Sequence, residues 1–136
     1  MITSFEDYID LLDNDDNAVF RRAVEEAVSE DVLFRTITER PELKKWIIHN
    51  KLVPDSVLIL LAEDQDDNVR SRVARKRKLP FQYLVRLAQD QSEVVRSVVV
   101  HHPKITKQLL DILSHDKEPE IAEIARQRLS DQDYRD

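Results

Sequence analysis

The most constraining feature of the sequence is a pattern that recurs every 26 residues. One largely apolar register that ends in aspartate occurs three times, as Val57, Leu58, Leu61, Ala62 and Asp64, as Tyr83, Leu84, Leu87, Ala88 and Asp90, and as Leu109, Leu110, Leu113, Ser114 and Asp116. A second apolar register returns at Leu43, Val69, Val95 and Ile121. A fixed period of this length is typical of a solenoid, because each unit is too small to bury its own apolar face and must stack on its neighbours.

Both registers have the spacing of helices. Val57, Leu58 and Leu61 follow one stripe of a helix and do not alternate as a strand would. Pro54 and Pro80 stand where helices begin, and a proline at the first turn of a helix loses no hydrogen bond. The patterns predict about ten helices, near residues 3–13, 17–28, 31–39, 42–50, 55–63, 67–77, 81–89, 93–101, 105–114 and 119–129.

The predicted units differ in regularity along the chain. The period shortens to 24 before residue 41, so we expect divergent units at about residues 3–40 and regular units at about residues 41–129. A polar tail follows at residues 130–136. Repeat arrays commonly end in atypical units, because their outer faces meet water. We therefore predict one helical-repeat domain over residues 1–136.

Three segments of the chain resemble a known repeat family. The segments Leu84–Asp90 and Val94–Val100, followed by His102 and Pro103, resemble the leucine-rich repeat variant family, which is related to the HEAT-like repeats. The resemblance implies an all-α fold, a short right-handed α-solenoid of paired helices. It implies little about activity.

The composition disfavours several classes of protein. The chain of 136 residues contains no glycine, so phosphate-binding loops and dinucleotide-binding turns are disfavoured. It contains no cysteine, so disulfide frameworks and thiolate metal sites are excluded. Residues 1–10 lack the pattern of a signal peptide, and the longest apolar run, residues 57–62, is too short to span a membrane. We expect a cytoplasmic protein that has no membrane segment.

The sequence contains no recognisable catalytic motif. The histidines His49, His101, His102 and His115 lack metal-ligand spacing and a partner nucleophile. We interpret His101 and His102 as cations at the end of a helix, where the helix dipole favours positive charge. Paired carboxylates stand at predicted helix starts, where they serve as caps. We expect no catalytic residue, no metal site, no cofactor and no enzyme activity.

Charge is distributed along the chain in blocks. Residues 1–66 hold 16 acidic and 7 basic residues, a net charge of −9, and residues 67–110 hold 3 acidic and 10 basic residues, a net charge of +7. Residues 111–136 have a net charge of −4. Cations at the end of a helix are favoured by its dipole. HEAT-like proteins also contain ladders of Asp and Arg, which favours a pairing of Arg70 with Asp64 and of Arg96 with Asp90, six residues earlier in each case.

Such a ladder leaves a second group of cations unexplained. These candidates for contact with phosphate or with an acidic protein surface are Arg72, Arg75, Lys76, Arg77 and Lys78. Against a nucleic acid stand the isoelectric point of about 5.2 and the acidic flanking blocks, which repel a long duplex. A protein partner meets no such objection.

Two aromatic residues are candidates for an interface. Phe20 occupies the repeat position of Lys44, Arg70 and Arg96, which suggests exposure. The column of Trp46 contains both charged and apolar residues. Exposed aromatic residues anchor many interfaces, but the alternative is that the first, irregular unit buries both. We expect Tyr83 to lie in the core.

These features predict a non-catalytic protein that binds another macromolecule and is a monomer when free. The first hypothesis is an inhibitor of the immunity type, which covers a basic partner such as a nuclease toxin and is steered by Asp13, Asp15 and Asp16. One alternative is a HEAT-like protein that grips the nucleic-acid backbone through residues 70–78. Another is a structural adaptor within an assembly.

Overall fold

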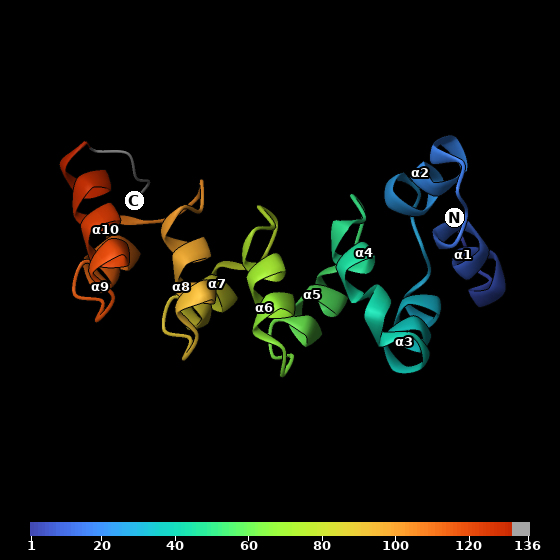
Figure 1. Cartoon of the computed structure of the whole chain (residues 1–136), viewed down its shortest axis with the longest axis horizontal. Coiled ribbons are helices and arrows are strands. Elements are labelled where there is room, and N and C mark those ends of the chain that lie inside the picture. The colour runs from blue at the N-terminus through green and yellow to red at the C-terminus, as the bar shows by residue number, and fades with distance from the viewer. Residues whose placement is uncertain (132–136) are drawn as a thin grey trace. The chain divides into compact units, whose positions relative to one another are not determined.

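A computed structural model describes residues 1–131, which form ten α-helices and one 3₁₀ helix (Figure 1). The α-helices are α1 (Phe5–Leu12), α2 (Asn17–Glu25), α3 (Glu30–Glu39), α4 (Lys44–His49), α5 (Asp55–Leu61), α6 (Asp67–Ala74), α7 (Phe81–Leu87), α8 (Glu93–Val100), α9 (Lys107–Leu113) and α10 (Pro119–Ser130). The 3₁₀ helix η1 (Pro41–Leu43) leads directly into α4. No β-strand occurs within residues 1–131, where an isolated β-bridge joins Ile2 to Val28.

The all-helical fold predicted from the sequence is confirmed. Each of the ten predicted helices is present, and each end lies within three residues of its predicted position. The predicted helix at residues 42–50 begins as η1 and continues as α4. The right-handed solenoid and the single domain stay predictions. Of the predicted polar tail, residues 132–136 lie outside the described residues.

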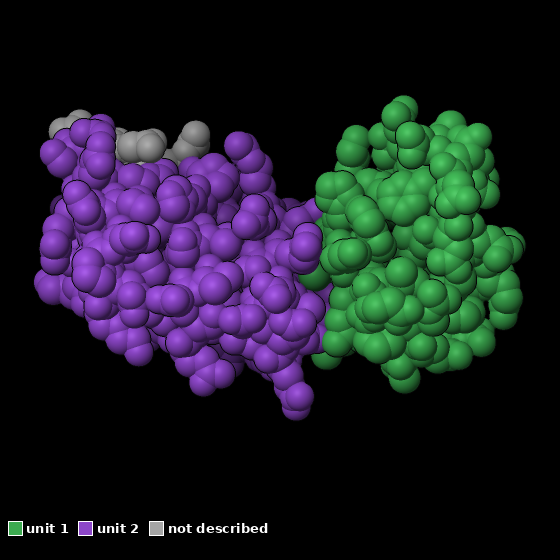
Figure 2. Space-filling view, in the orientation of Figure 1, with its two compact units in different colours: residues 1–60 green, residues 61–136 purple. Residues whose placement is uncertain are grey.

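The chain divides into two units of packed helices, which we name unit 1 (residues 1–60) and unit 2 (residues 61–136) (Figure 2). In unit 1, α1 packs against α2 and α3, and α2 packs against α4. The side chains of Tyr8, Leu33 and Ile47 are fully buried there. Burial raises the pKa of the Tyr8 hydroxyl, which has no hydrogen-bond partner within residues 1–131.

In unit 2, α8 is the central helix. It contacts α6, α7, α9 and α10, and its residues Val95 and Val99 are fully buried. Side chains cap three helices of unit 2, because Asp66, Ser92 and Thr106 accept hydrogen bonds from backbone N–H groups in the first turns of α6, α8 and α9. These caps fix where each helix starts, and hence which side chains it presents to solvent.

Tyr83 differs from its predicted place in the core. Its ring is half-buried, and the Arg86 guanidinium lies 5.7 Å from the ring centroid. The following residue, Leu84, is buried. A tyrosine in a column of aliphatic residues keeps its polar end near solvent, which the repeat pattern alone does not show.

No helix within residues 1–131 combines the length and the apolar character that a membrane span needs.

Candidate macromolecule-binding surfaces

The predicted acidic residues of unit 1 lie around the turn between α1 and α2. Asp13, Asp15 and Asp16 are all exposed. Asp16 caps α2, because its Oδ1 accepts hydrogen bonds from the N–H groups of Ala18 at 2.8 Å and Val19 at 3.4 Å. Asp13 Oδ2 lies 3.8 Å from Arg40 Nη1. Asp16 therefore has a structural role as well as a charge, whereas no such bond holds Asp15 within residues 1–131.

The structure brings Phe20 of α2 and Trp46 of α4 together. Their ring centroids are 5.0 Å apart and their planes make an angle of 83°, which is the edge-to-face arrangement that aromatic pairs favour. Both side chains are half-buried. Lys45 Nζ lies 5.3 Å from the Trp46 ring centroid, and the His49 ring lies 6.0 Å away. The pair thus presents part of its apolar area to solvent beside a cation and a histidine.

The reason given for an exposed Phe20 was wrong. Phe20 shares its repeat position with Arg70 and Arg96, and both arginines are buried, not exposed. The position therefore lies against neighbouring helices, and Phe20 is half-buried because its ring packs on Trp46. The N–H of Phe20 donates to the carbonyl of Asp16 at 2.9 Å, so the aromatic pair begins one helical turn after the acidic turn. We name these five residues the acidic–aromatic patch: Asp13, Asp15, Asp16, Phe20 and Trp46.

The predicted Arg–Asp ladder exists in unit 2, but its register was wrong. Arg70 donates through Nε and Nη2 to the carboxylate of Asp90 at 2.9 and 3.0 Å, twenty residues later. It donates through Nη1 to the backbone carbonyl of Asp64 at 2.7 Å. Arg96 repeats the arrangement with the carboxylate of Asp116 and the carbonyl of Asp90. Each arginine thus binds a backbone carbonyl of the loop that precedes its own helix and the carboxylate of the corresponding loop one repeat later.

These ion pairs are structural. The side chains of Arg96 and Asp116 are 7% and 6% exposed. Burial works against ionisation of Asp116, but the hydrogen bonds from Arg96 and from the Glu118 N–H outweigh it, so the pKa of this carboxyl lies below its usual value. The hydrogen bonds with Asp90 likewise raise the pKa of Arg70. Arg70 is therefore not part of any solvent-facing basic surface, which corrects the predicted surface at residues 70–78.

The remaining predicted cations surround the end of α6. Arg72 lies in its last turn, Arg75 caps it, and Lys76, Arg77 and Lys78 follow in the loop before α7. Lys76 is half-buried, and burial together with the nearby Lys78 lowers its pKa. The other four residues are Arg72, Arg75, Arg77 and Lys78, which we name the basic cluster. Within residues 1–131, none of these four forms an ion pair.

Polar residues that the apolar repeat pattern does not single out join successive helix pairs. Asn50 Nδ2 donates to the carbonyls of Ala23 at 2.7 Å and Glu26 at 2.8 Å. In unit 2, Arg128 Nη1 donates to the carbonyls of Val100 and His102. Asn50 and Arg128 belong to one column of the repeat, in which positions 26 residues apart are Asn50, Lys76, His102 and Arg128. That regular spacing of hydrogen-bond donors was the signal that could have revealed them.

His102 belongs to this column, and its interpretation as a helix-end cation was wrong. The side chain is buried, its Nδ1 accepts from the N–H of Lys104 at 3.0 Å, and its Nε2 lies 3.3 Å from the carbonyl oxygen of Lys76. A ring that accepts through Nδ1 is neutral and carries its proton on Nε2. Burial lowers the pKa of His102, and the nearby Lys104, Arg77 and Arg128 add to this effect.

We predict that His102 contributes to an acid-induced loss of stability. Because its pKa is lower in the folded state than in the unfolded state, its contribution is fully present above about pH 6.5 and is lost as the pH falls through the folded-state pKa. The variant His102→Asn, which copies Asn50, should keep the fold and lose less stability than the parent chain between pH 7.5 and 5. Urea unfolding at the two pH values measures this difference, and equal losses would contradict it.

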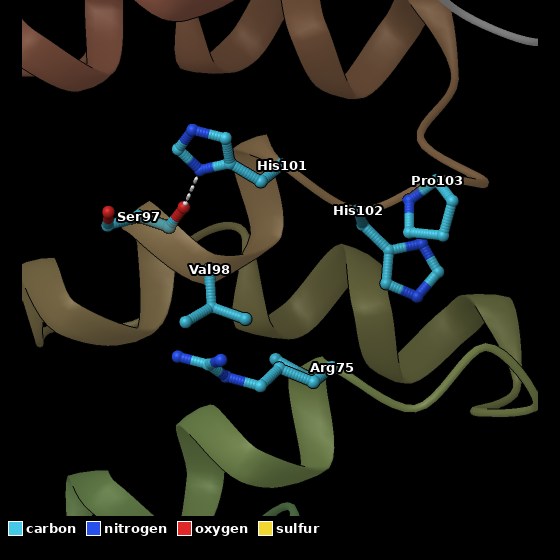
Figure 3. A pocket seen from close by; sticks show the side chains of 7 residues that line it. Arg75, Ser97, Val98, His101, His102 and Pro103 are labelled. Carbon is cyan, nitrogen blue, oxygen red and sulfur yellow. Dashed lines mark hydrogen bonds between the residues drawn. The ribbon is translucent and has the colours of Figure 1, made fainter.

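A groove runs along α8 on the surface of unit 2. A hollow of about 680 Å³ lies over Val94, Val98 and Ile124, and a second of about 280 Å³ continues from Val98 to Pro103. In Figure 3, Arg75 extends beneath Val98, and His101 is turned back onto the carbonyl of Ser97, at 2.8 Å. Both hollows share Arg75, Ser97 and Val98, so we treat them as one groove and name it the α8 groove.

Comparisons of the chain with protein-family models, with curated proteins and with solved structures find no match. Among residues 1–131, no group of three or more His, Cys, Asp or Glu side chains is arranged to hold a metal ion.

Proposed function

We propose that the chain is a non-catalytic, HEAT-like binding protein of the immunity type, which neutralises a basic protein such as a nuclease toxin by covering its cationic surface. The observation that carries the proposal is the acidic–aromatic patch of unit 1. Three exposed carboxylates precede α2, and the half-exposed ring pair of Phe20 and Trp46 begins one turn later. The net charge of −9 over residues 1–66 supports the same conclusion.

The two parts of the patch have different physical tasks. Carboxylates that remain hydrated attract a cationic surface over several ångströms and so raise the association rate. Aromatic rings that lose their remaining exposed area on contact slow dissociation, since buried Trp and other aromatic anchors dominate interface energies. A patch that combines both is suited to fast and tight capture of a basic protein.

The repeat architecture supports a binding role. The same Arg–Asp pair recurs 26 residues apart, as Arg70 with Asp90 and as Arg96 with Asp116. Ion pairs that recur between successive loops hold neighbouring helix pairs together as a stack. We propose that this stack is a HEAT-like solenoid of the leucine-rich repeat variant type. Such stacks act as rigid supports for extended binding surfaces.

Reversing the charge at Asp13 and Asp15 and neutralising Asp16 is expected to weaken capture of the basic partner by about tenfold or more at low salt and to flatten its salt dependence. The test variant is Asp13→Lys, Asp15→Lys and Asp16→Asn, in which the asparagine preserves the cap of α2. The partner is first identified by affinity purification from native lysate with nuclease treatment, followed by mass spectrometry. Association rates are then measured by surface plasmon resonance over a series of salt concentrations.

The matched control reverses two exposed carboxylates at the start of α3, Glu30→Lys and Asp31→Lys. It changes the net charge by a similar amount without altering the patch. An equal loss of affinity in both variants would mean that only overall charge matters, and unchanged affinity in the test variant would overturn the steering role of the patch.

Nucleic-acid binding is the second candidate, and the basic cluster favours it. Arg72, Arg75, Arg77 and Lys78 are exposed and form no ion pair within residues 1–131. Unpaired cations of this kind contact phosphate backbones. In the same purification, loss of all bound partners after nuclease treatment would favour this candidate over the first.

A further inference from the structure

The floor of the α8 groove is apolar and open to solvent. Val94 is 44% exposed, and Val98 and Ile124 are half-buried beside it. Branched aliphatic side chains in a concave surface gain the most when another apolar side chain excludes water from them. The hollow over them, about 680 Å³, has room for more than one such side chain.

The groove has an acidic end, and a cation lies farther along it. Glu93, Glu118 and Glu120 line the end where α8 and α10 begin, and Arg75, which lines both hollows, lies beneath Val98 (Figure 3). The basic cluster continues beyond Arg75 into the loop before α7. Within residues 1–131 Arg75 forms no ion pair, so its charge is available to a ligand.

This distribution of charge selects the class of ligand. A nucleic-acid backbone would place phosphates against Glu93 and Glu120, and the repulsion disfavours it. An amphipathic helix has the complementary pattern, because acidic residues are favoured in its first turn and basic residues in its last. Its apolar stripe would lie on Val94, Val98 and Ile124.

We propose that the α8 groove binds a short amphipathic helix of a protein partner, with its acidic first turn at Arg75 and its basic last turn at Glu93 and Glu120. The bound helix runs antiparallel to α8, so the two helix dipoles also attract. Since α8 has eight residues and each adds 1.5 Å, the groove accommodates two to three turns. The inference rests on the proposed function in that both require a protein partner, but it concerns a different surface.

The first experiment uses a designed peptide as the probe. It has about 10 residues, nearly three turns, with Glu in the first turn, Leu at helical spacing along one face and Lys in the last turn. A second peptide has Glu and Lys exchanged, and a covalent link between residues four apart holds both peptides helical. Titration into the ¹⁵N-labelled chain should show that the first peptide binds about tenfold tighter, with chemical-shift changes centred on Val94, Val98 and Ile124.

Two variants of matched exposure test the location. Val94→Glu places a charge on the groove floor and should reduce binding about tenfold or more, and acid in the first turn of α8 does not disfavour the helix. Ile112→Glu changes a residue of α9 that is 45% exposed and does not line the groove, so it should leave binding unchanged. Arg75→Glu should reverse the preference between the two peptides.

Three results would overturn the proposal: equal binding of the two peptides, no binding of either, or equal losses in Val94→Glu and Ile112→Glu. The basic partner is assayed separately through the acidic–aromatic patch. If the partner is captured while neither peptide binds, only the groove proposal fails. If the first peptide binds while no basic partner is captured, the proposed inhibitor function fails and the groove proposal stands.

Discussion

Replacing Arg96 with alanine is expected to lower the free energy of unfolding by about 3–5 kcal/mol. The substitution leaves the carboxylate of Asp116 buried without its cation, and it removes the donor to the carbonyl of Asp90. A buried charge that loses its partner costs far more than the intact pair contributes. Because domains of this size unfold at about 5–15 kcal/mol, the loss is a large fraction of the total. Urea unfolding followed by far-ultraviolet circular dichroism measures it.

A double variant shows whether charge burial is the cause. In Arg96→Met with Asp116→Asn, the methionine fills the space of the arginine stem, and the asparagine still accepts from the N–H of Glu118. We expect this variant to recover most of the lost stability. Asp116→Asn alone leaves Arg96 buried and should remain destabilised. If the double variant loses as much stability as Arg96→Met and Asp116→Asn lose in sum, the ion pair is not the reason for the loss.

Replacing Asn50 with alanine is expected to lower the free energy of unfolding by about 3 kcal/mol. Asn50 is 1% exposed, and its amide joins the carbonyls of Ala23 and Glu26 to the N–H of Leu52. Each buried backbone group left without a partner costs about 1–3 kcal/mol. Fluorescence of Trp46, the only tryptophan, follows the unfolding of unit 1 in urea.

The variant Asn50→Asp separates hydrogen bonding from packing. It keeps the shape of the side chain and the acceptor for Leu52, but at neutral pH it turns a carboxylate oxygen toward two carbonyl oxygens. We expect a loss at pH 7 at least as large as that of the alanine variant. A loss smaller than that of alanine would mean that the filled volume matters more than the donor.

The helices could be predicted because the local signals agree. The apolar residues recur at helical spacing, and Asp66, Ser92 and Thr106 supply the caps that their residue types suggest. Each of these signals depends only on residues that are close together in the chain, so it can be recognised from a single sequence.

The pairing of side chains between turns could not be predicted in the same way. Asp64 and Asp90 occupy equivalent positions, so the period shows that Arg70 faces this column but not which member it binds. Which aspartate Arg70 binds depends on the spacing between one pair of helices and the next in the folded chain. The same limit explains His102, whose burial and whose contact with a carbonyl 26 residues earlier depend on how the helices pack.

The candidate surfaces were predicted in part. Asp13, Asp15 and the basic cluster are exposed, as charged residues outside the ladder were expected to be. The contact of Phe20 with Trp46 was beyond the repeat pattern, because it joins columns that hold charged side chains elsewhere. The α8 groove was also missed, since a hollow arises from the distance between helices.

The ion pair between Arg96 and Asp116 also affects the local unfolding of α9 and α10 in unit 2. If α9 and α10 frayed by themselves, the guanidinium on α8 would stay behind with its anion gone. Partial opening of this kind is therefore disfavoured relative to loss of the whole group of helices. We expect the slowest-exchanging amide hydrogens of α8 and α10 to exchange with solvent at one common rate. The five helices α6 to α10 would then unfold as a single cooperative unit.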